Sequence, residues 1–237
     1  VRNGEVDLAF VCTSAYLSGS REFGMQLLVV PQVNGETVYR AQLIVPKTSQ
    51  AESLEDLRGK TFAFTDPTSL TGRMYPTFLL QQAGETPENF FTRTFFTYSH
   101  DDAIYAVAQG LADGASVDSV VLDFALKRDP ALLEQIRVIH TSEPFGMPPV
   151  VAGPQIRPQS WAELQTLLFQ MFQDPAGLTA LQTLDYDQFV FTSPDNSLEC
   201  VDAPFAGCNP VDCRPTLLAR IFWINPLRVV WQFIFRA

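Results

Sequence analysis

Residues 62–72 (FAFTDPTSLTG) combine an apolar strand pattern with a loop rich in hydroxyl side chains. A helix is predicted to follow this loop, over residues 72–83. A hydroxyl-rich loop at a helix start offers hydroxyl donors and free backbone N–H groups at the positive helix end, which suits a tetrahedral oxyanion. Ser69 and Thr71 are therefore candidate oxyanion-binding residues. Ordinary capping of the helix by either residue explains the same pattern without a ligand.

Residues 98–110 (YSHDDAIYAVAQG) form a second candidate segment. Ser99 fits an N-cap, and Asp102 completes a capping box, so His100 takes the first helical position. An imidazole at this position can direct an N–H group into the space that the helix end faces. The alternative is an exposed histidine without a functional role.

A third loop, residues 116–119 (SVDS), also follows a predicted strand. Its Asp118 could accept a hydrogen bond from a protonated oxyanion or from an amine on a ligand, or it could simply cap the next helix. All three loops follow strands of one parallel unit, and ligands of open α/β sheets bind beyond the carboxyl ends of the strands. The pattern therefore predicts that the three loops meet.

Strand and helix patterns alternate along the chain, which is typical of α/β proteins with parallel sheets. Asn34 and Gly35 separate two β-rich runs and form a hairpin-type turn signal. The predicted strands are residues 6–12, 25–33, 37–45, 60–65, 93–98, 115–118 and 137–141. The predicted helices are residues 72–83, 101–111, a segment after Asp118 ending at Lys127, 158–173 and 175–184.

The composition excludes some classes of protein. Hydrophobic residues make up 46% of the 237 residues and charged residues 18%, which is typical of a globular protein. The net charge of −10 argues against a nucleic-acid partner, because phosphate backbones require a basic surface. It does not exclude a small anion, because neutral hydrogen-bond donors and helix ends can bind one on a protein of either sign.

The cysteines do not indicate a metal site. Cys12 lies far from Cys200, Cys208 and Cys213, no Cys-x-x-Cys pair occurs, and the chain has two histidines, His100 and His140. We therefore expect no metal and no cofactor. A disulfide among the three later cysteines stays open, because spacing does not determine connectivity.

The two ends of the sequence carry separate expectations. No basic and then apolar leader follows Val1, so no signal peptide is expected within this sequence. The α/β pattern stops after Ser193, and residues 195–237 are expected to form an atypical tail. Its apolar stretch, 217–235, is not expected to span a membrane, because Arg220, Pro226 and Arg228 are among the residues that interrupt it.

Four segments together resemble the phosphonate-binding protein family of uptake transporters. They are TDPTSLTG, the later SHDDAIYAVAQGLADGASVDS, the early GEVDLAFVCTSAYL, and DPAG at residues 174–177. The resemblance covers residues 4–189. It implies that Ser69 and Thr71 bind oxygen atoms of an oxyanion, that His100 donates to another oxygen, and that Tyr16 closes the pocket from the opposite lobe. Leu70 departs from the family, which often has a hydroxyl donor there, and the family's first strand and helix are absent.

The resemblance implies an α/β protein with the type II periplasmic-binding-protein fold, in which two lobes flank a hinged cleft and lobe one is incomplete. We expect a partial lobe one in residues 1–45, lobe two with the oxyanion loops in 46–140, a return to lobe one in 141–194, and the tail in 195–237. The ligand-binding residues would be Tyr16, Ser69, Thr71, His100 and Asp118.

The implied function is capture of a phosphonate, phosphite or phosphate for an ABC permease, without catalysis. The implied location is periplasmic or extracellular, with contact to a membrane only through the permease or through an anchor outside this sequence. Two alternatives stay open. One is an extracellular sensor domain, and the other is an enzyme with His100 as acid–base and Asp101 or Asp102 as its orienting residue.

Overall fold

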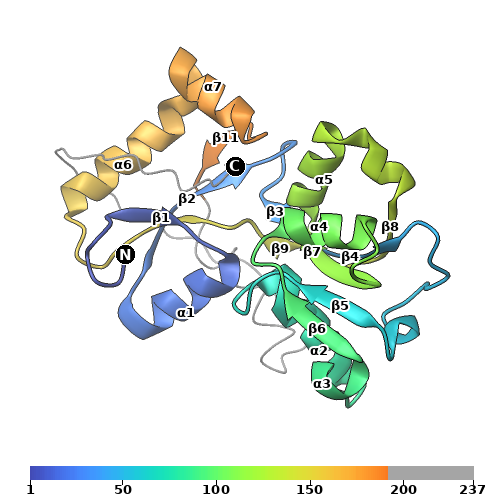
Figure 1. The fold of residues 1–237 in the computed structure, drawn as a ribbon. Helices are drawn as coiled ribbons and strands as arrows, with labels where there is room; N and C mark the ends of the chain where they lie inside the picture. The colour runs from blue at the N-terminus through green and yellow to red at the C-terminus, as the bar shows by residue number, and fades with distance from the viewer. Residues whose placement is uncertain (192–237) are drawn as a thin grey trace.

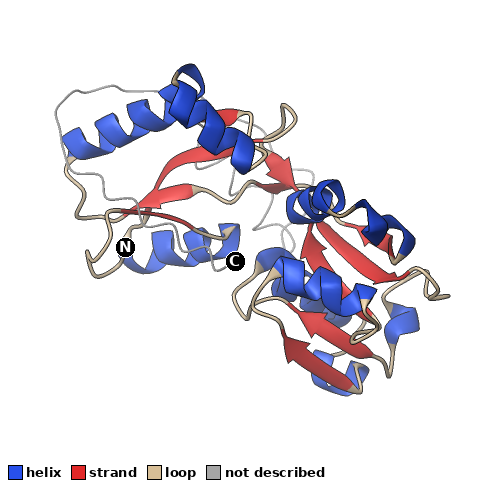
Figure 2. Cartoon of the chain, turned by 45° about the horizontal axis from the view of Figure 1, so that its top comes forward, coloured by secondary structure: helices blue, strands red, loops and turns tan. Residues whose placement is uncertain are grey.

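The computed structural model describes residues 1–191, which form two lobes, each with a β-sheet flanked by helices (Figures 1 and 2). The sheet of lobe one has the strand order β1-β10-β2-β11, and the sheet of lobe two has the order β6-β5-β7-β4-β8. A two-stranded ribbon, β3-β9, lies where the chain passes between the lobes. This arrangement agrees with the fold expected from the sequence.

Lobe two contains the strands that lead into the three candidate loops. β5 (Thr61–Phe64) pairs in parallel with β6 (Arg93–Phe96) and β7 (Gly114–Asp118), while β4 (Ala41–Pro46) pairs antiparallel with β7 and β8 (Ile136–Thr141). The parallel pairs bring the carboxyl ends of β5, β6 and β7 to one edge of the sheet. The predicted meeting of the three loops is therefore confirmed.

Alternation along β5 explains how helices cover both faces of this sheet. Ala63 packs with α4 (His100–Ala108) and α5 (Ser119–Arg128). Phe62 and Phe64 point to the other face, where they pack against α2 (Tyr75–Gln82) and α3 (Pro87–Phe90). Side chains of successive strand residues point to opposite faces, so one short strand contributes to two hydrophobic cores.

Lobe one is built on antiparallel pairs. β2 (Gln26–Gln32) lies between β10 (Val150–Ala152) and β11 (Gln188–Val190), and β1 (Leu8–Phe10) pairs with β10. Helix α1 (Thr13–Phe23) packs on one face of this sheet. Helices α6 (Pro158–Gln170) and α7 (Pro175–Thr183), joined by the 3-10 turn Met171–Gln173, pack on the other.

The hinge ribbon joins strands β3 (Val38–Tyr39) and β9 (Phe145–Gly146). Tyr39 and Phe145 are buried and belong to a hydrophobic cluster that also contains Tyr16 of lobe one and Leu70 of lobe two. The ribbon is therefore part of one apolar core that continues from lobe to lobe.

Most of the predicted elements are confirmed within a few residues, but the two β-rich runs on either side of Asn34 and Gly35 do not pair as the strands of one hairpin. Asn34 (φ 52°) and Gly35 (φ 79°) do form a tight turn, closed by the Val33–Glu36 bridge. The strands on either side then separate: β2 stays in lobe one, whereas β3 and β4 enter the ribbon and lobe two. Local turn chemistry predicts the reversal of the chain, and tertiary contacts decide which strands pair.

Helix α1 and strands β9, β10 and β11 were not predicted from the sequence. These strands have two or three residues each, too few for a clear alternation.

β4 belongs to the five-stranded sheet, so we propose to draw the lobe boundary before Ala41 instead of after Val45.

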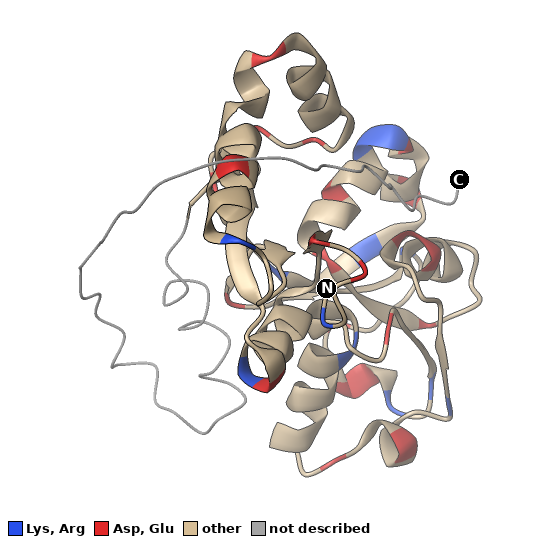
Figure 3. Cartoon of the chain, turned by 90° about the vertical axis from the view of Figure 1, so that its left-hand side faces the viewer, with Lys and Arg blue, Asp and Glu red and all other residues tan. Residues whose placement is uncertain are grey.

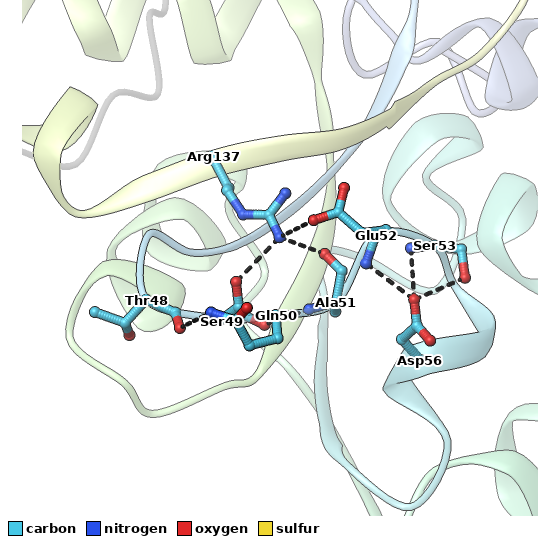
Figure 4. A network of polar contacts seen from close by, with 8 residues as sticks. All are labelled: Thr48, Ser49, Gln50, Ala51, Glu52, Ser53, Asp56 and Arg137. Atoms are coloured by element: carbon cyan, nitrogen blue, oxygen red, sulfur yellow. Dashed lines mark hydrogen bonds and ion pairs between the residues drawn. The ribbon is translucent and has the colours of Figure 1, made fainter.

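One network of polar contacts secures the segment after β4 (Figure 4). The Arg137 guanidinium on β8 donates to the carbonyl oxygens of Ser49 (3.0 Å) and Ala51 (2.6 Å) and to the Glu52 carboxylate (3.0 Å). The Asp56 carboxylate accepts from Ser53 N–H (3.0 Å) and Oγ (3.0 Å) at the start of the 3-10 turn Glu55–Leu57. Asp56 thus ties this turn to the chain that precedes it.

No helix within residues 1–191 is both long and apolar enough to cross a membrane. Over the same residues, acidic and basic segments are interspersed on both lobes in the view of Figure 3. The expected tail, its apolar stretch and three of the four cysteines lie outside the described residues.

Candidate ligand-binding site

The loop after β5 is organised around Ser69. Ser69 is the N-cap of a single π-helical turn, Leu70–Met74, and its Oγ accepts a hydrogen bond from Gly72 N–H (3.0 Å). Since this oxygen accepts from the backbone, its own O–H is free to donate to a ligand. A Cβ at Gly72 would lie 1.8 Å from Thr65 Oγ1, so only glycine fits this turn. π-helical turns recur at functional sites.

Two further contacts hold the same loop. Asp66 Oδ1 accepts from Thr68 N–H (2.8 Å) and Oγ1 (2.6 Å), which closes a local turn before Ser69. On the other side, Ser116 Oγ on β7 donates to the Thr71 carbonyl oxygen (2.5 Å). Thr71 itself is 1% exposed. The loop is therefore held in place by its own side chains and by the neighbouring strand.

His100 lies next to this loop at the first position of α4, as the sequence predicted, with Ser99 Oγ capping the helix. Its Nε2 is 3.5 Å from Ser69 Oγ, and its Nδ1 accepts a hydrogen bond from the backbone N–H of Asp118 (3.1 Å). A nitrogen that accepts from an amide carries no proton, so the proton of the neutral ring is on Nε2. The fold thus makes His100 a donor directed toward Ser69.

Burial lowers the pKa of His100 to about 4, and the nearby Asp66 carboxylate opposes this shift only in part. The ring is therefore neutral at physiological pH. Asp101, proposed above as an orienting residue for a catalytic histidine, instead faces Arg128 at 3.7 Å. The group that orients His100 is an amide N–H, which cannot accept a proton from the ring.

Asp118 caps α5, since its Oδ1 accepts from Val120 N–H (2.8 Å) and Val121 N–H (3.3 Å). Burial raises the pKa of this carboxyl to about 6, against the lowering effect of these two hydrogen bonds. Burial raises the pKa of the Cys12 thiol to about 11, and the Asp118 carboxylate adds to this shift. Asp118 therefore lies at the junction with lobe one and is close to its titration range at neutral pH.

Lobe one presents the start of α1 to this junction. Ser14 Oγ donates to the Thr68 carbonyl oxygen of the lobe-two loop (2.6 Å), and Thr13 Oγ1 donates to the Gly146 carbonyl oxygen of the hinge ribbon (2.9 Å). Cys12 precedes both residues as the N-cap of α1. Hydroxyl residues between a strand and a helix occur here as in the loop after β5, and this pattern is a sequence signal for Thr13 and Ser14 that was missed above.

Tyr16 lies one turn further along α1 and is 4% exposed. It packs in the apolar cluster that also contains Leu70, between the two hydroxyl residues of the oxyanion loop. The structure thus brings Ser69, Thr71, His100 and Asp118 together at the edge of the lobe-two sheet and places Tyr16 against the same loop from lobe one. Whether these residues bind a ligand stays a prediction.

The chemistry of this site is that of uncharged donors. The side-chain donors are the Ser69 O–H and the His100 Nε2–H. Further donors come from the starts of the π-helical turn, α4 and α5, where backbone N–H groups have no intrahelical partners. The positive ends of these helices favour an anion. Asp118 is the one carboxyl group among the predicted ligand-binding residues, and it suits a proton-bearing group of a ligand.

Two α/β lobes joined by a two-stranded hinge, with three helix-start loops at their junction, define a solute-binding protein of the type II periplasmic fold. The family model of the "ABC transporter, phosphonate, periplasmic substrate-binding protein" matches residues 1–197, and the chain belongs to this family. Members are substrate-binding proteins of the periplasm, so the family implies a small-molecule ligand and a permease partner.

Individual relatives agree with this assignment. The chain is 26% identical over 110 residues to a probable ABC transporter phosphite binding protein, PhnD1, of Prochlorococcus marinus, and this match covers 44% of the chain and 37% of that relative's length. A binding protein component of an ABC phosphonate transporter from Pseudomonas aeruginosa has a similar fold, with a TM-score of 0.75, 22% identity, and coverage of 84% of this chain and 68% of that one.

The structure of PhnD1 from Prochlorococcus marinus in complex with methylphosphonate has a TM-score of 0.72 to this chain at 18% identity, covering 86% of this chain and 80% of that one. At these identities, the solved structures establish the type II fold. The suggested residue-level site rests on the geometry described above.

Proposed function

We propose that the protein binds a small phosphorus oxyanion (phosphonate, phosphite or phosphate) between its lobes and delivers it to an ABC permease. The observation that carries the proposal is the pair of donors at the ends of β5 and β6: Ser69 Oγ, oriented by Gly72 N–H, and His100 Nε2, oriented by Asp118 N–H. Backbone contacts hold both side chains in place, and such ordering reduces the entropic cost of binding.

Neutral donors suit repeated capture and release. A neutral imidazole and a hydroxyl give charge-assisted hydrogen bonds to an anion without adding a buried cation that would remain unpaired after release. Closure of the lobes then removes water from these bonds and strengthens them. The Ser14–Thr68 hydrogen bond joins the two lobes at this junction.

Asp118 supports selection of a ligand that carries a proton donor. A phosphonate, phosphite or phosphate monoanion has a P–OH group, and an aminoalkylphosphonate also has an ammonium group. Sulfate has neither at neutral pH, so it would meet the Asp118 carboxylate with lone pairs only. We therefore expect the site to favour phosphorus oxyanions over sulfate.

The test is calorimetric titration of phosphate, phosphite, methylphosphonate and 2-aminoethylphosphonate, with sulfate for comparison. Each charge-assisted hydrogen bond contributes about 1.5–3 kcal/mol, so Ser69→Ala and His100→Gln should each weaken binding about ten- to a hundredfold. Thr86→Ala is the matched control, because it removes a hydroxyl at the start of α3, outside the proposed site.

Binding of none of the four phosphorus ligands would overturn the proposed function. Equal binding by wild type and both site variants would overturn the assignment of Ser69 and His100 while leaving the ligand class in place. Sulfate binding as tight as phosphite binding would remove the proposed role of Asp118.

A further inference from the structure

The junction of the lobes carries an ion pair outside the proposed ligand site. Lys127, in the last turn of α5 in lobe two, donates through Nζ to Asp185 Oδ2, in the turn between α7 and β11 of lobe one. We propose that this ion pair is a latch that favours the closed arrangement of the lobes, so that ligand affinity depends on two residues that do not touch the ligand. The proposal goes beyond the proposed function and does not depend on the identity of the ligand.

The surrounding charges explain why one lysine matters. Asp123 lies one turn before Lys127 on the same helix, and Asp187 follows Asp185, where its carboxylate accepts from Gly35 N–H (2.7 Å). The hydrogen bond to Asp185 is the largest cause that raises the pKa of Lys127, and the Asp123 and Asp187 carboxylates add to it. A single ammonium group therefore attracts three carboxylates, of which Asp123 and Asp185 repel each other.

The effect of opening can be assigned to particular contacts. Lys127 and Asp123 are four residues apart on one helix, so they remain neighbours whether the lobes are together or apart. Lys127 and Asp185 belong to different lobes, so opening separates them. Besides burial, the Asp185 carboxylate raises the pKa of Asp123, which indicates a repulsion across the junction that opening also relieves.

The same helix provides a matched control. Arg128 is adjacent to Lys127, is 51% exposed as against 54% for Lys127, and faces Asp101 at 3.7 Å. Both partners of this second pair belong to lobe two. Removing the Arg128 charge therefore changes an ion pair of the same kind without changing any contact between the lobes.

Cys12 provides a readout that needs no ligand. It is half-buried at the start of α1, two residues before the Ser14 contact to lobe two, and burial raises its pKa to about 11. Asp118 and Asp66 of lobe two add to this shift. Thiol alkylation requires the thiolate, so opening should speed the reaction through both greater exposure and a lower pKa.

The experiment measures the rate of Cys12 alkylation by N-ethylmaleimide in the full chain, with peptide mass spectrometry to separate this cysteine from the other three. Lys127→Gln should raise the rate about two- to fivefold at low salt, the range for a partly exposed ion pair, and Arg128→Gln should leave it unchanged. High salt should raise the wild-type rate toward that of Lys127→Gln, because screening weakens the pair.

Two more variants test the sign of the effect. The double variant Lys127→Glu with Asp185→Lys restores a pair of opposite charges, so its alkylation rate should return toward the wild-type value. The alkylation rate of Lys127→Glu alone should be higher than that of Lys127→Gln. Asp123→Asn removes a repulsion across the junction and should slow the reaction. Equal rates for Lys127→Gln and Arg128→Gln, or failure of the exchanged pair to restore the wild-type rate, would overturn the latch.

Discussion

His100 is the residue whose behaviour depends most on its surroundings. The backbone N–H of Asp118 selects its tautomer, and burial keeps it neutral. Neither the amide nor the burial is visible in the residues next to it in the chain. The contact exists because β6 and β7 both pair in parallel with β5, which brings the starts of α4 and α5 to the same edge of the sheet.

This environment predicts a measurable titration. Nitrogen NMR shifts should report a proton on His100 Nε2 and a midpoint near pH 4. A folded pKa below the unfolded value of about 6.5 means that the unfolded chain binds more protons, so stability should fall as the pH drops from about 6.5 to 4. Denaturant unfolding should show a smaller fall for His100→Gln. A midpoint near 6.5 would contradict the buried, amide-bound ring.

At the scale of elements, β8 and the segment after β4 are joined by Arg137. Its guanidinium is 24% exposed and contacts two carbonyl oxygens, whereas the Glu52 carboxylate that completes the network is 79% exposed. An exposed carboxylate contributes little to such a pair, but a lost cation leaves carbonyl groups without a donor. The important contacts of Arg137 are therefore those to the main chain.

Two substitutions separate these contributions. Arg137→Met should lower the free energy of unfolding by about 1–3 kcal/mol, because the Ser49 and Ala51 carbonyls lose their donor. Glu52→Gln keeps those bonds and should change stability by less than about 0.5 kcal/mol. Urea unfolding curves measure both values. An equal loss for the two variants would mean that the ion pair is the larger contribution.

At the scale of the whole molecule, the lobes share one apolar cluster through the hinge. Phe145 of the ribbon makes ring contacts with Tyr39 (6.1 Å between centroids) and with Tyr75 of lobe two (5.8 Å). Tyr75 in turn follows the π-helical turn of the oxyanion loop. Movement at the hinge and the position of the predicted oxyanion loop are thus linked through packed side chains.

Phe145→Ala should lower the free energy of unfolding by about 3–5 kcal/mol, since a ring that is 2% exposed leaves a cavity. The unfolding of the lobes should also become separable, with probes in each lobe giving different midpoints. Phe172→Ala is the control, because this ring is 41% exposed. Coincident midpoints and a loss no larger than that of the control would show that the ribbon does not couple the lobes.

The sequence by itself was sufficient for those residues on lobe two whose role as helix caps depends on local chemistry. Ser69, Ser99 and Asp118 act as helix caps, and capping involves atoms within three residues in the chain. The order of strands 60–65, 93–98 and 115–118 also implied that their loops meet, because parallel strands end at a common edge.

Only the tertiary structure decided how the two lobes meet. The strands flanking Asn34 and Gly35 carry a hairpin signal but do not pair with each other. Instead β2 pairs with β10 and β11, which lie more than a hundred residues away in the chain. The Ser14–Thr68 and Lys127–Asp185 contacts likewise join residues 54 and 58 positions apart. Periodicity and capping report on neighbours in the chain, whereas these pairs depend on how the complete lobes are placed.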